Sequence, residues 1–201
     1  MAKLKNFMIS RVRVEMMELF FSNPEEMYYV RQITRLINEE INAVRRELER
    51  MLGSGLLKSE ERGNRLYYFI NKRYLYFQEL RQMVAKSTGL GKKIKSKRRK
   101  LGSIDFVMFS GKYIRGLKPV QDEVDMLFVG DIDLNLLQKL VKEEEKELGR
   151  EINYAVFSKE EFNFRKTRRD PFIMDILYGS RVMIIGTEVD FVHREIPGLS
   201  Q

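Results

Sequence analysis

The sequence has no cysteine and a single histidine, His193, among its 201 residues. The absence of cysteine excludes a disulfide framework, a thiolate zinc site and a cysteine nucleophile. One histidine excludes any metal site that needs two imidazole ligands. No stretch approaches the roughly 18 consecutive apolar residues of a membrane span, and the N-terminal residues lack a secretory signal pattern. We therefore expect a cytoplasmic protein that has no membrane partner.

Positive charge is concentrated in one half of the chain. The formal net charge is +8, but residues 1–100 hold 23 Lys and Arg against 11 Asp and Glu, whereas residues 101–201 hold 14 against 18. The halves therefore carry +12 and −4. This asymmetry predicts that the first half binds a polyanion and that the second half has a different role. A hydrophobic content of 43% is sufficient for two packed domains.

The first half has the pattern of three helices followed by a hairpin. Apolar residues at helical spacing predict helices over residues 9–21, 30–37 and 39–52, with an extended piece at 27–29 and Asn38 as the cap of the third helix. Two β-prone runs, 56–59 and 66–70, flank a Gly63-Asn64 turn and predict a hairpin, and a helix over 74–86 follows. This order is typical of a winged helix-turn-helix domain, here residues 1–85, whose third helix enters the major groove of DNA.

Double-stranded DNA is accordingly the predicted partner of the first domain. We expect Asn42, Arg45 and Arg46 near base edges and the arginines of the hairpin on phosphates. The alternative is an ordinary solvated helix face, because exposed arginines are common. The candidate DNA-binding residues lie on the second helix, the third helix and the hairpin: Arg31, Gln32, Asn42, Arg45, Arg46, Arg50, Arg62, Asn64 and Arg65.

Residues 86–102 are predicted to form a basic connector. Lys92 to Lys100 holds seven positive charges in nine residues and no acid. Such a run is either a solvated linker or a strip of phosphate contacts that adds sequence-independent affinity for DNA. Both interpretations place a domain boundary here.

The second half predicts an α/β domain with a mixed sheet over residues 103–197, which makes the whole chain α+β. Short apolar runs predict strands near 104–109, 123–129, 152–156 and 182–185. Helical patterns lie between them, at 134–148, 159–165 and 171–178.

Residues 109–116 read Phe-Ser-Gly-Lys-Tyr-Ile-Arg-Gly, and residues 122–129 read Asp-Glu-Val-Asp-Met-Leu-Phe-Val. The pattern resembles the nucleotidyltransferase signature, in which a Gly-Ser turn follows one strand and two carboxylates begin the next. Aligned without a gap, Gly111 matches the glycine, Lys112 the serine, and Glu123 and Asp125 the carboxylates.

This spacing suits metal-assisted nucleotide binding. Carboxylates at positions i and i+2 of a strand point to the same face, so Glu123 and Asp125 are candidate metal ligands for Mg²⁺ that bridges the phosphates of a nucleoside triphosphate. Gly111 and Lys112 are candidate nucleotide-binding residues, since a glycine turn lets backbone N–H groups approach phosphates.

Several other stretches extend the resemblance over about residues 9–186. They include Phe20 to Glu26, Val44 to Leu48, Gly63 to Tyr68, Leu148 to Tyr154 and Asp170 to Phe172. Together they resemble the prokaryotic family in which an ArsR-like winged helix is fused to a nucleotidyltransferase-fold domain. The resemblance implies a DNA-binding transcriptional regulator. It also implies a homodimer, which fits the palindromic sites that helix-turn-helix proteins bind.

Three departures from the signature favour a degenerate, non-catalytic second domain, so no catalytic residue is assigned. Lys112 replaces serine, Glu123 replaces the first aspartate, and Asn153 stands where a third carboxylate is expected. The Lys112 ammonium is expected either between the two carboxylates, in place of a metal, or on a phosphate. Three roles therefore stay open: nucleotide binding without turnover, assembly, and an active metal-dependent nucleotidyltransferase positioned by the winged helix.

Overall fold

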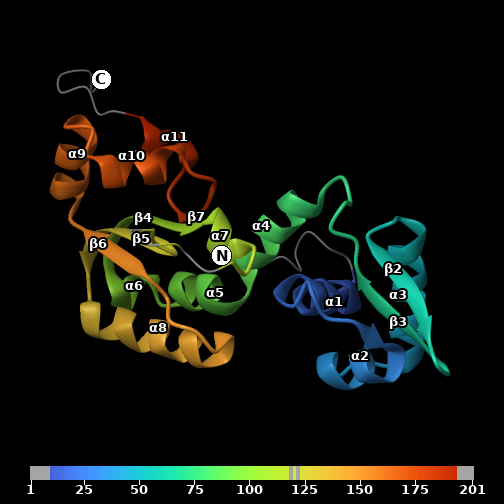
Figure 1. Ribbon diagram of the computed structural model, residues 1–201. Coiled ribbons are helices and arrows are strands. Elements are labelled where there is room, and N and C mark those ends of the chain that lie inside the picture. Colours follow the sequence, from blue (N-terminus) through green and yellow to red (C-terminus); the bar gives the residue numbers. More distant parts are fainter. Residues whose placement is uncertain (1–9, 118–119, 121–122, 194–201) are drawn as a thin grey trace. The chain divides into compact units, whose positions relative to one another are not determined.

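The computed structural model describes residues 10–117, 120 and 123–193. Residues 1–9 of the first predicted domain, and Asp122 and residues 194–197 of the second, lie outside these described residues. The chain is a mixed α+β protein, as predicted, and divides into two compact units, Met1–Thr88 and Gly89–Gln201 (Figure 1). Within the described ranges, no helix is both long enough and apolar enough to span a bilayer.

The first unit contains the predicted helices and hairpin in the predicted order. Its elements are α1 (Arg11–Ser22), β1 (Tyr28–Tyr29), α2 (Val30–Ile37), α3 (Ile41–Gly53), β2 (Leu57–Arg62), β3 (Arg65–Ile70) and α4 (Phe77–Ser87).

The caps of α2 and α3 differ from the expectation for Asn38. Asn38 ends α2 in the left-handed conformation, with φ of 51°. The cap of α3 is Glu40, whose carboxylate accepts the N–H groups of Asn42 and Ala43. A longer acidic side chain two residues later therefore takes the role predicted for Asn38.

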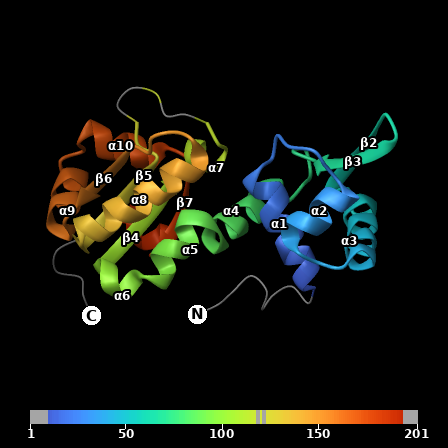
Figure 2. The ribbon, with the colours of Figure 1, turned by 90° about the horizontal axis from the view of Figure 1, so that it is seen from below.

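The helices of the first unit pack on one apolar core. Met16 of α1, Ile33 of α2 and Val44 of α3 are each completely buried in it. The sheet has the order β1-β3-β2 and is antiparallel throughout. After Leu57 every residue of β2 is exposed, and the hairpin projects beyond the helices of its unit (Figure 2).

The segment predicted as a basic connector is helical and belongs mostly to the second unit. It forms α5 (Gly89–Ser96) and α6 (Arg98–Leu101). Leu90, Ile94 and Leu101 are at most 1% exposed and lie in the core of the second unit. That unit therefore begins at Gly89 rather than at residue 103, because three apolar residues at helical spacing anchor a segment that composition alone marks as a linker.

The second unit is built on a four-stranded mixed sheet of order β6-β5-β4-β7. β5 and β6 are parallel, and the other pairs are antiparallel. The remaining elements are β4 (Gly102–Ser110), α7 (Gly111–Ile114), β5 (Met126–Ile132), α8 (Leu134–Leu148), β6 (Tyr154–Phe157), α9 (Lys159–Thr167), α10 (Pro171–Tyr178), β7 (Arg181–Ile185) and α11 (Glu188–Val192).

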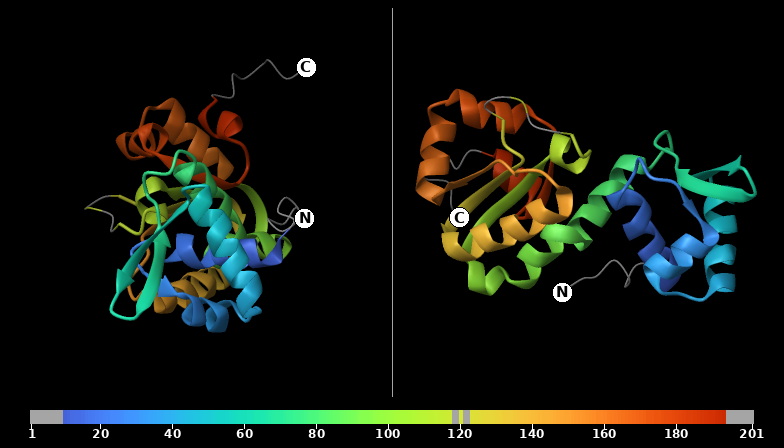
Figure 3. Two further views of the ribbon diagram at one scale, coloured as in Figure 1. Left: turned by 90° about the vertical axis from the view of Figure 1, so that its right-hand side faces the viewer. Right: turned by 60° about the horizontal axis from the view of Figure 1, so that its bottom comes forward.

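Helices cover both faces of this sheet. One face packs against α5, α6 and α8, and the other against α9, α10 and α11 (Figure 3). Along β5, Met126 and Phe128 enter the first core, whereas Leu127 and Val129 enter the second. A strand buried on both sides reads as a continuous apolar run, which is why β5 was readable from sequence.

Candidate functional site

The outer face of α3 presents unpaired cations. Asn42, Arg45 and Arg46 are exposed, while Val44 and Leu48 on the opposite side are buried. Neither Arg45 nor Arg46 forms an ion pair or a side-chain hydrogen bond with any described residue. These three predicted residues therefore lie together on an accessible helix face.

Two of the acids at this end of the unit, Glu40 and Glu47, are already bound. Glu40 accepts hydrogen bonds of 2.8 Å from the backbone N–H groups of Asn42 and Ala43. These bonds lower the pKa of the Glu40 carboxyl. Glu47, at 2% exposure, is paired with Arg13 of α1 and with Arg50, 3.4 Å away. Arg50, which the sequence predicts on a phosphate, is thus held by Glu47.

A basic hollow of about 710 Å³ lies between α2, α3 and the hairpin. It brings together four of the predicted DNA-binding residues, Arg31, Arg45, Asn64 and Arg65, and adds Arg35, which the sequence analysis did not select. No acid is among its described lining residues, so we call it the arginine hollow; the full lining is Tyr29, Val30, Arg31, Thr34, Arg35, Arg45, Asn64, Arg65 and Leu66.

Five predicted residues do not line the hollow: Gln32, Asn42, Arg46, Arg50 and Arg62. Arg62 is exposed but paired with Glu60, with Nε 3.1 Å from Oε1. Gln32 is half-buried on α2. The hairpin therefore offers Arg65 without a carboxylate partner and Arg62 with one.

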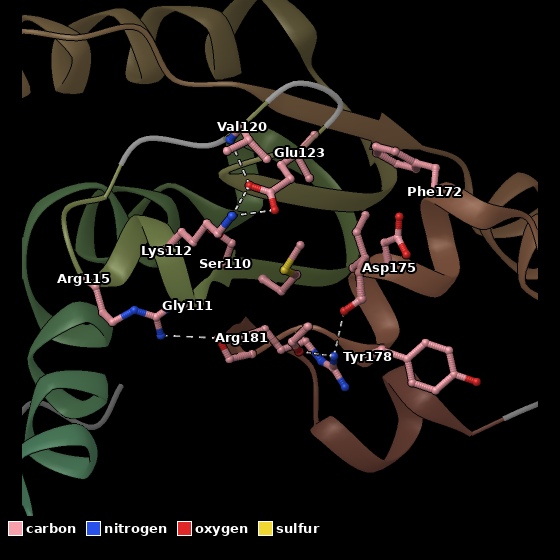
Figure 4. Close-up of a pocket in the computed structure, with 15 residues that line it drawn as sticks. Ser110, Gly111, Lys112, Arg115, Val120, Glu123, Phe172, Asp175, Tyr178 and Arg181 are labelled. Atoms are coloured by element: carbon pink, nitrogen blue, oxygen red, sulfur yellow. Dashed lines mark hydrogen bonds and ion pairs between the residues drawn. The ribbon is translucent and has the colours of Figure 1, made fainter.

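In the second unit, Lys112 and Glu123 form a close ion pair. Nζ of Lys112 lies 2.6 Å from both carboxylate oxygens of Glu123, and the N–H of Val120 donates to the same carboxylate at 2.9 Å (Figure 4). The hydrogen bond from Lys112 and then that from Val120 lower the pKa of Glu123. Both side chains of the pair remain more than a third exposed.

Asp125 is bound to a different cation. It is completely buried, and Arg150 holds it through both guanidinium ends, at 2.8 and 3.1 Å. The N–H of Asn153 adds a third hydrogen bond, at 3.1 Å. The hydrogen bond with Asp125 raises the pKa of Arg150. Arg150 is the residue of this site that the sequence analysis missed, because nothing in the local pattern links it to a carboxylate 25 positions earlier.

The expectation that the two carboxylates share one face of a strand is wrong. β5 begins at Met126, so Glu123 and Asp125 lie in the irregular segment before it, where the two-residue alternation does not apply. A divalent ion would have to displace the Arg150 guanidinium from the buried Asp125 carboxylate. No cluster of three potential ligands for a metal exists among the residues that the structure covers. The donor set therefore does not fit a resident metal.

The Arg150 pair is part of a larger polar network. Its guanidinium lies over the ring of Tyr113, 5.6 Å from the centroid. Burial, followed by the charge of Glu144, raises the pKa of Tyr113 above its ordinary range. Glu144 is in turn bound by Lys93 of α5 at 3.2 Å. Asp125 is therefore fixed by a set of contacts that reaches α5 and α8.

A pocket of about 470 Å³ lies beside the exposed ion pair. Its lining includes Lys112 and Glu123 on one side and Asp175 and Tyr178 of α10 on another (Figure 4). Gly111 is at its edge, but the Gly111 N–H donates to the carbonyl of Ser180 at 2.6 Å. This N–H is used inside the protein, which differs from the expectation that it faces a phosphate.

The glycine at position 111 has a packing reason. A Cβ atom there would lie 1.9 Å from Oγ and 2.9 Å from Cβ of Ser180. Only glycine lets the start of α7 approach the turn before β7 so closely.

Comparison with known proteins assigns this chain to no family. No protein-family model and no curated protein matches the chain. Among solved structures, human N-acetylserotonin methyltransferase in complex with SAM is similar over 49% of this chain, with 14% identity and a TM-score of 0.29. The match spans 33% of that methyltransferase chain.

Proposed function

We propose that the protein is a DNA-binding transcriptional regulator whose first unit is a winged helix-turn-helix module. The observation that carries this proposal is the outer face of α3, where Asn42, Arg45 and Arg46 are exposed and neither arginine has a carboxylate partner among the described residues. Arginine and asparagine are the side chains that read guanine and adenine edges in the major groove. The projecting hairpin and the arginine hollow supply cations for the backbone.

Selection of duplexes from a random library, followed by affinity measurements, tests the proposal. We expect the native protein to enrich a sequence and to prefer it over a scrambled duplex. Replacing both Arg45 and Arg46 by alanine should weaken binding to the selected duplex by about tenfold or more, because each base contact contributes about 1–3 kcal/mol.

The matched control removes two exposed lysines, Lys139 and Lys142, from α8 in the second unit. This Lys139→Ala, Lys142→Ala variant has the same net charge as the double arginine variant and should keep the native preference. Equal affinity of the Arg45→Ala, Arg46→Ala variant and the native protein for the selected duplex would contradict the proposal.

For the second unit we propose a degenerate nucleotidyltransferase-like domain without catalysis. The support is that each signature carboxylate is occupied by a cation of the chain, Glu123 by Lys112 and Asp125 by Arg150. Separating a buried pair costs several kcal/mol, because it leaves an uncompensated charge in a low dielectric. A nucleotide-bound metal would have to supply that energy.

An active metal-dependent nucleotidyltransferase is the second candidate, favoured by the pocket that the Lys112–Glu123 pair borders. Calorimetric titration with ATP, GTP and CTP, each with and without Mg²⁺, separates the two proposals. The degenerate domain predicts no nucleotide turnover by the native protein, and binding without turnover would assign it nucleotide binding. Mg²⁺-dependent binding and turnover by the native protein would establish the enzyme. Nucleotide binding by a Lys112→Ser variant, but not by the native protein, would identify Lys112 as the residue that prevents binding.

Homodimerisation belongs to the same proposal, because two-fold related half-sites are the usual targets of helix-turn-helix proteins. A palindromic selected sequence, bound with two chains per duplex, is the expected result. A selected site without two-fold symmetry, bound by one chain, would contradict it.

A further inference from the structure

Tyr29 contacts two arginines of the arginine hollow that come from different elements. Its hydroxyl accepts a hydrogen bond of 3.1 Å from Nη2 of Arg35, on α2. The guanidinium of Arg65, at the start of β3, lies over the Tyr29 ring with Cζ 4.6 Å from the centroid. One phenol therefore holds two guanidinium groups near each other.

Most donors of these two guanidinium groups remain available. Arg35 uses one further N–H, because Nε donates to the carbonyl of Arg31 at 3.3 Å. Arg65 makes no side-chain hydrogen bond to a described residue, and stacking engages only the face of its guanidinium. The edge of a stacked guanidinium stays free for the bidentate contact that phosphate favours.

Neither Arg35 nor Arg65 forms an ion pair with an acid among the described residues. Tyr67 of β3 lies between Tyr29 of β1 and Glu60 of β2 in the sheet. The Glu60 carboxylate is paired with Arg62. Arg31 and Arg45 line the same hollow and add two more positive charges. Like charges held at short distance repel one another, and a bound anion relieves that repulsion.

We propose that Tyr29 is the positioning residue of a phosphate clamp, formed by Arg35 and Arg65, that binds the phosphodiester backbone of double-stranded DNA. This inference rests on the proposed function and assigns a task to Tyr29 and Arg35, which the sequence analysis did not select. The clamp contacts no base. Its contribution is sequence-independent affinity and a fixed placement of the hairpin relative to the strand.

The first test is Tyr29→Phe in the full chain, with a fluorescently labelled random-sequence duplex as the probe. This substitution keeps the ring under Arg65 and removes the hydroxyl that orients Arg35. We expect binding to weaken by about threefold to tenfold, because Arg35 must then be ordered when the duplex binds. The matched control is Tyr67→Phe, which removes a hydroxyl from the neighbouring ring, 5.7 Å from that of Tyr29, and should bind like the native protein.

A double-mutant cycle separates positioning from a general structural role. In an Arg35→Ala background, Tyr29→Phe should cause no further loss, because the group that it orients is already absent. A purely structural role predicts the same loss in both backgrounds and would overturn the clamp. Tyr29→Leu should weaken binding more than Tyr29→Phe, because it also releases Arg65. Unchanged thermal unfolding midpoints of the variants exclude misfolding as the cause.

The outcomes distinguish the clamp from the proposed function. If the native protein does not bind the duplex, both proposals fall. If the Arg45→Ala, Arg46→Ala variant loses its sequence preference while Tyr29→Phe binds the random duplex like the native protein, only the clamp falls. A loss in Tyr29→Phe that disappears in the Arg35→Ala background supports both.

Discussion

The two units use their cations in opposite ways. In the first unit, Arg31, Arg45 and Arg46 are exposed and have no carboxylate partner among the described residues. In the second unit, Lys112 and Arg150 are each committed to an acid of the same unit. Net charge alone is therefore a weak guide to a binding surface, because the pairing of each cation decides whether it is available to a partner.

Each unit also contains an exception to this contrast. Glu47 of the first unit is buried between Arg13 and Arg50, and the exposed cations Arg99 and Lys100 of the second unit form no ion pair with any other described residue. The contrast therefore concerns the candidate sites and not every residue of a unit. Substitutions that create or remove a partner for one of these cations or acids test it.

The largest expected effect is that of Arg150→Ala on the second unit. It leaves the completely buried Asp125 carboxylate with no cation, which costs about 3–5 kcal/mol of unfolding free energy. Urea denaturation followed by circular dichroism measures the change. The double variant Asp125→Leu, Arg150→Met should recover most of it, since apolar residues of similar volume can replace a buried pair. A loss below about 1 kcal/mol would show that this pair behaves like a surface ion pair.

A smaller effect is expected for Arg13→Ala in the first unit. Glu47 keeps Arg50 as a partner, so the loss should be about 1–3 kcal/mol, the usual cost of an incompletely satisfied buried charge. Arg11→Ala is the matched control on the same helix, because Arg11 is 75% exposed in its pair with Glu39. It should cost less than about 1 kcal/mol in the same urea experiment. Equal losses of unfolding free energy in Arg13→Ala and Arg11→Ala would show that the burial of Glu47 does not determine the stability that Arg13 contributes.

Much of the fold was readable from sequence because its elements have strong local periodicity. The bounds of α2, α8 and α10 agree with the predicted ranges, and the two-residue turn of the hairpin lies at Gly63-Asn64 as expected. The composition of the basic segment 86–102, with its seven positive charges between Lys92 and Lys100, predicts a connector. Its folding depends on Leu90, Ile94 and Leu101 finding a core that only the rest of the unit supplies.

The candidate sites were less predictable, because pairing is a tertiary property. The sequence indicated the cations of the first unit, but not that Glu60 binds Arg62 or that Tyr29 holds Arg35 and Arg65. In the second unit the signature placed Lys112 near Glu123. It gave no sign of Arg150, whose contact with Asp125 depends on how β5 and β6 align.

Glu60→Gln should convert a paired cation of the hairpin into an available one. Arg62 then loses its carboxylate partner, so affinity for a random-sequence duplex should rise severalfold. The slope of log affinity against log salt concentration should steepen by about 0.9 if Arg62 gains one phosphate contact. Fluorescence anisotropy at several NaCl concentrations measures both quantities. Glu79→Gln, which removes an exposed acid from α4, is the control for net charge alone. The same gain in both variants would show that only total charge matters.

The smallest expected effect is the pH dependence of the Lys112–Glu123 pair. Because Lys112 and the Val120 N–H lower the pKa of Glu123 in the folded chain, the pair stabilises the protein above the ordinary value of 4.5, and this contribution is lost as the pH falls through the lowered pKa. At pH 7 the native protein should exceed Glu123→Gln by less than about 1 kcal/mol, since both partners are partly exposed. The difference in unfolding free energy, followed by urea denaturation from neutral to strongly acidic pH, should shrink toward zero. A difference that grows as the pH falls would mean that the ionised Glu123 carboxylate destabilises the folded protein despite its ion pair with Lys112.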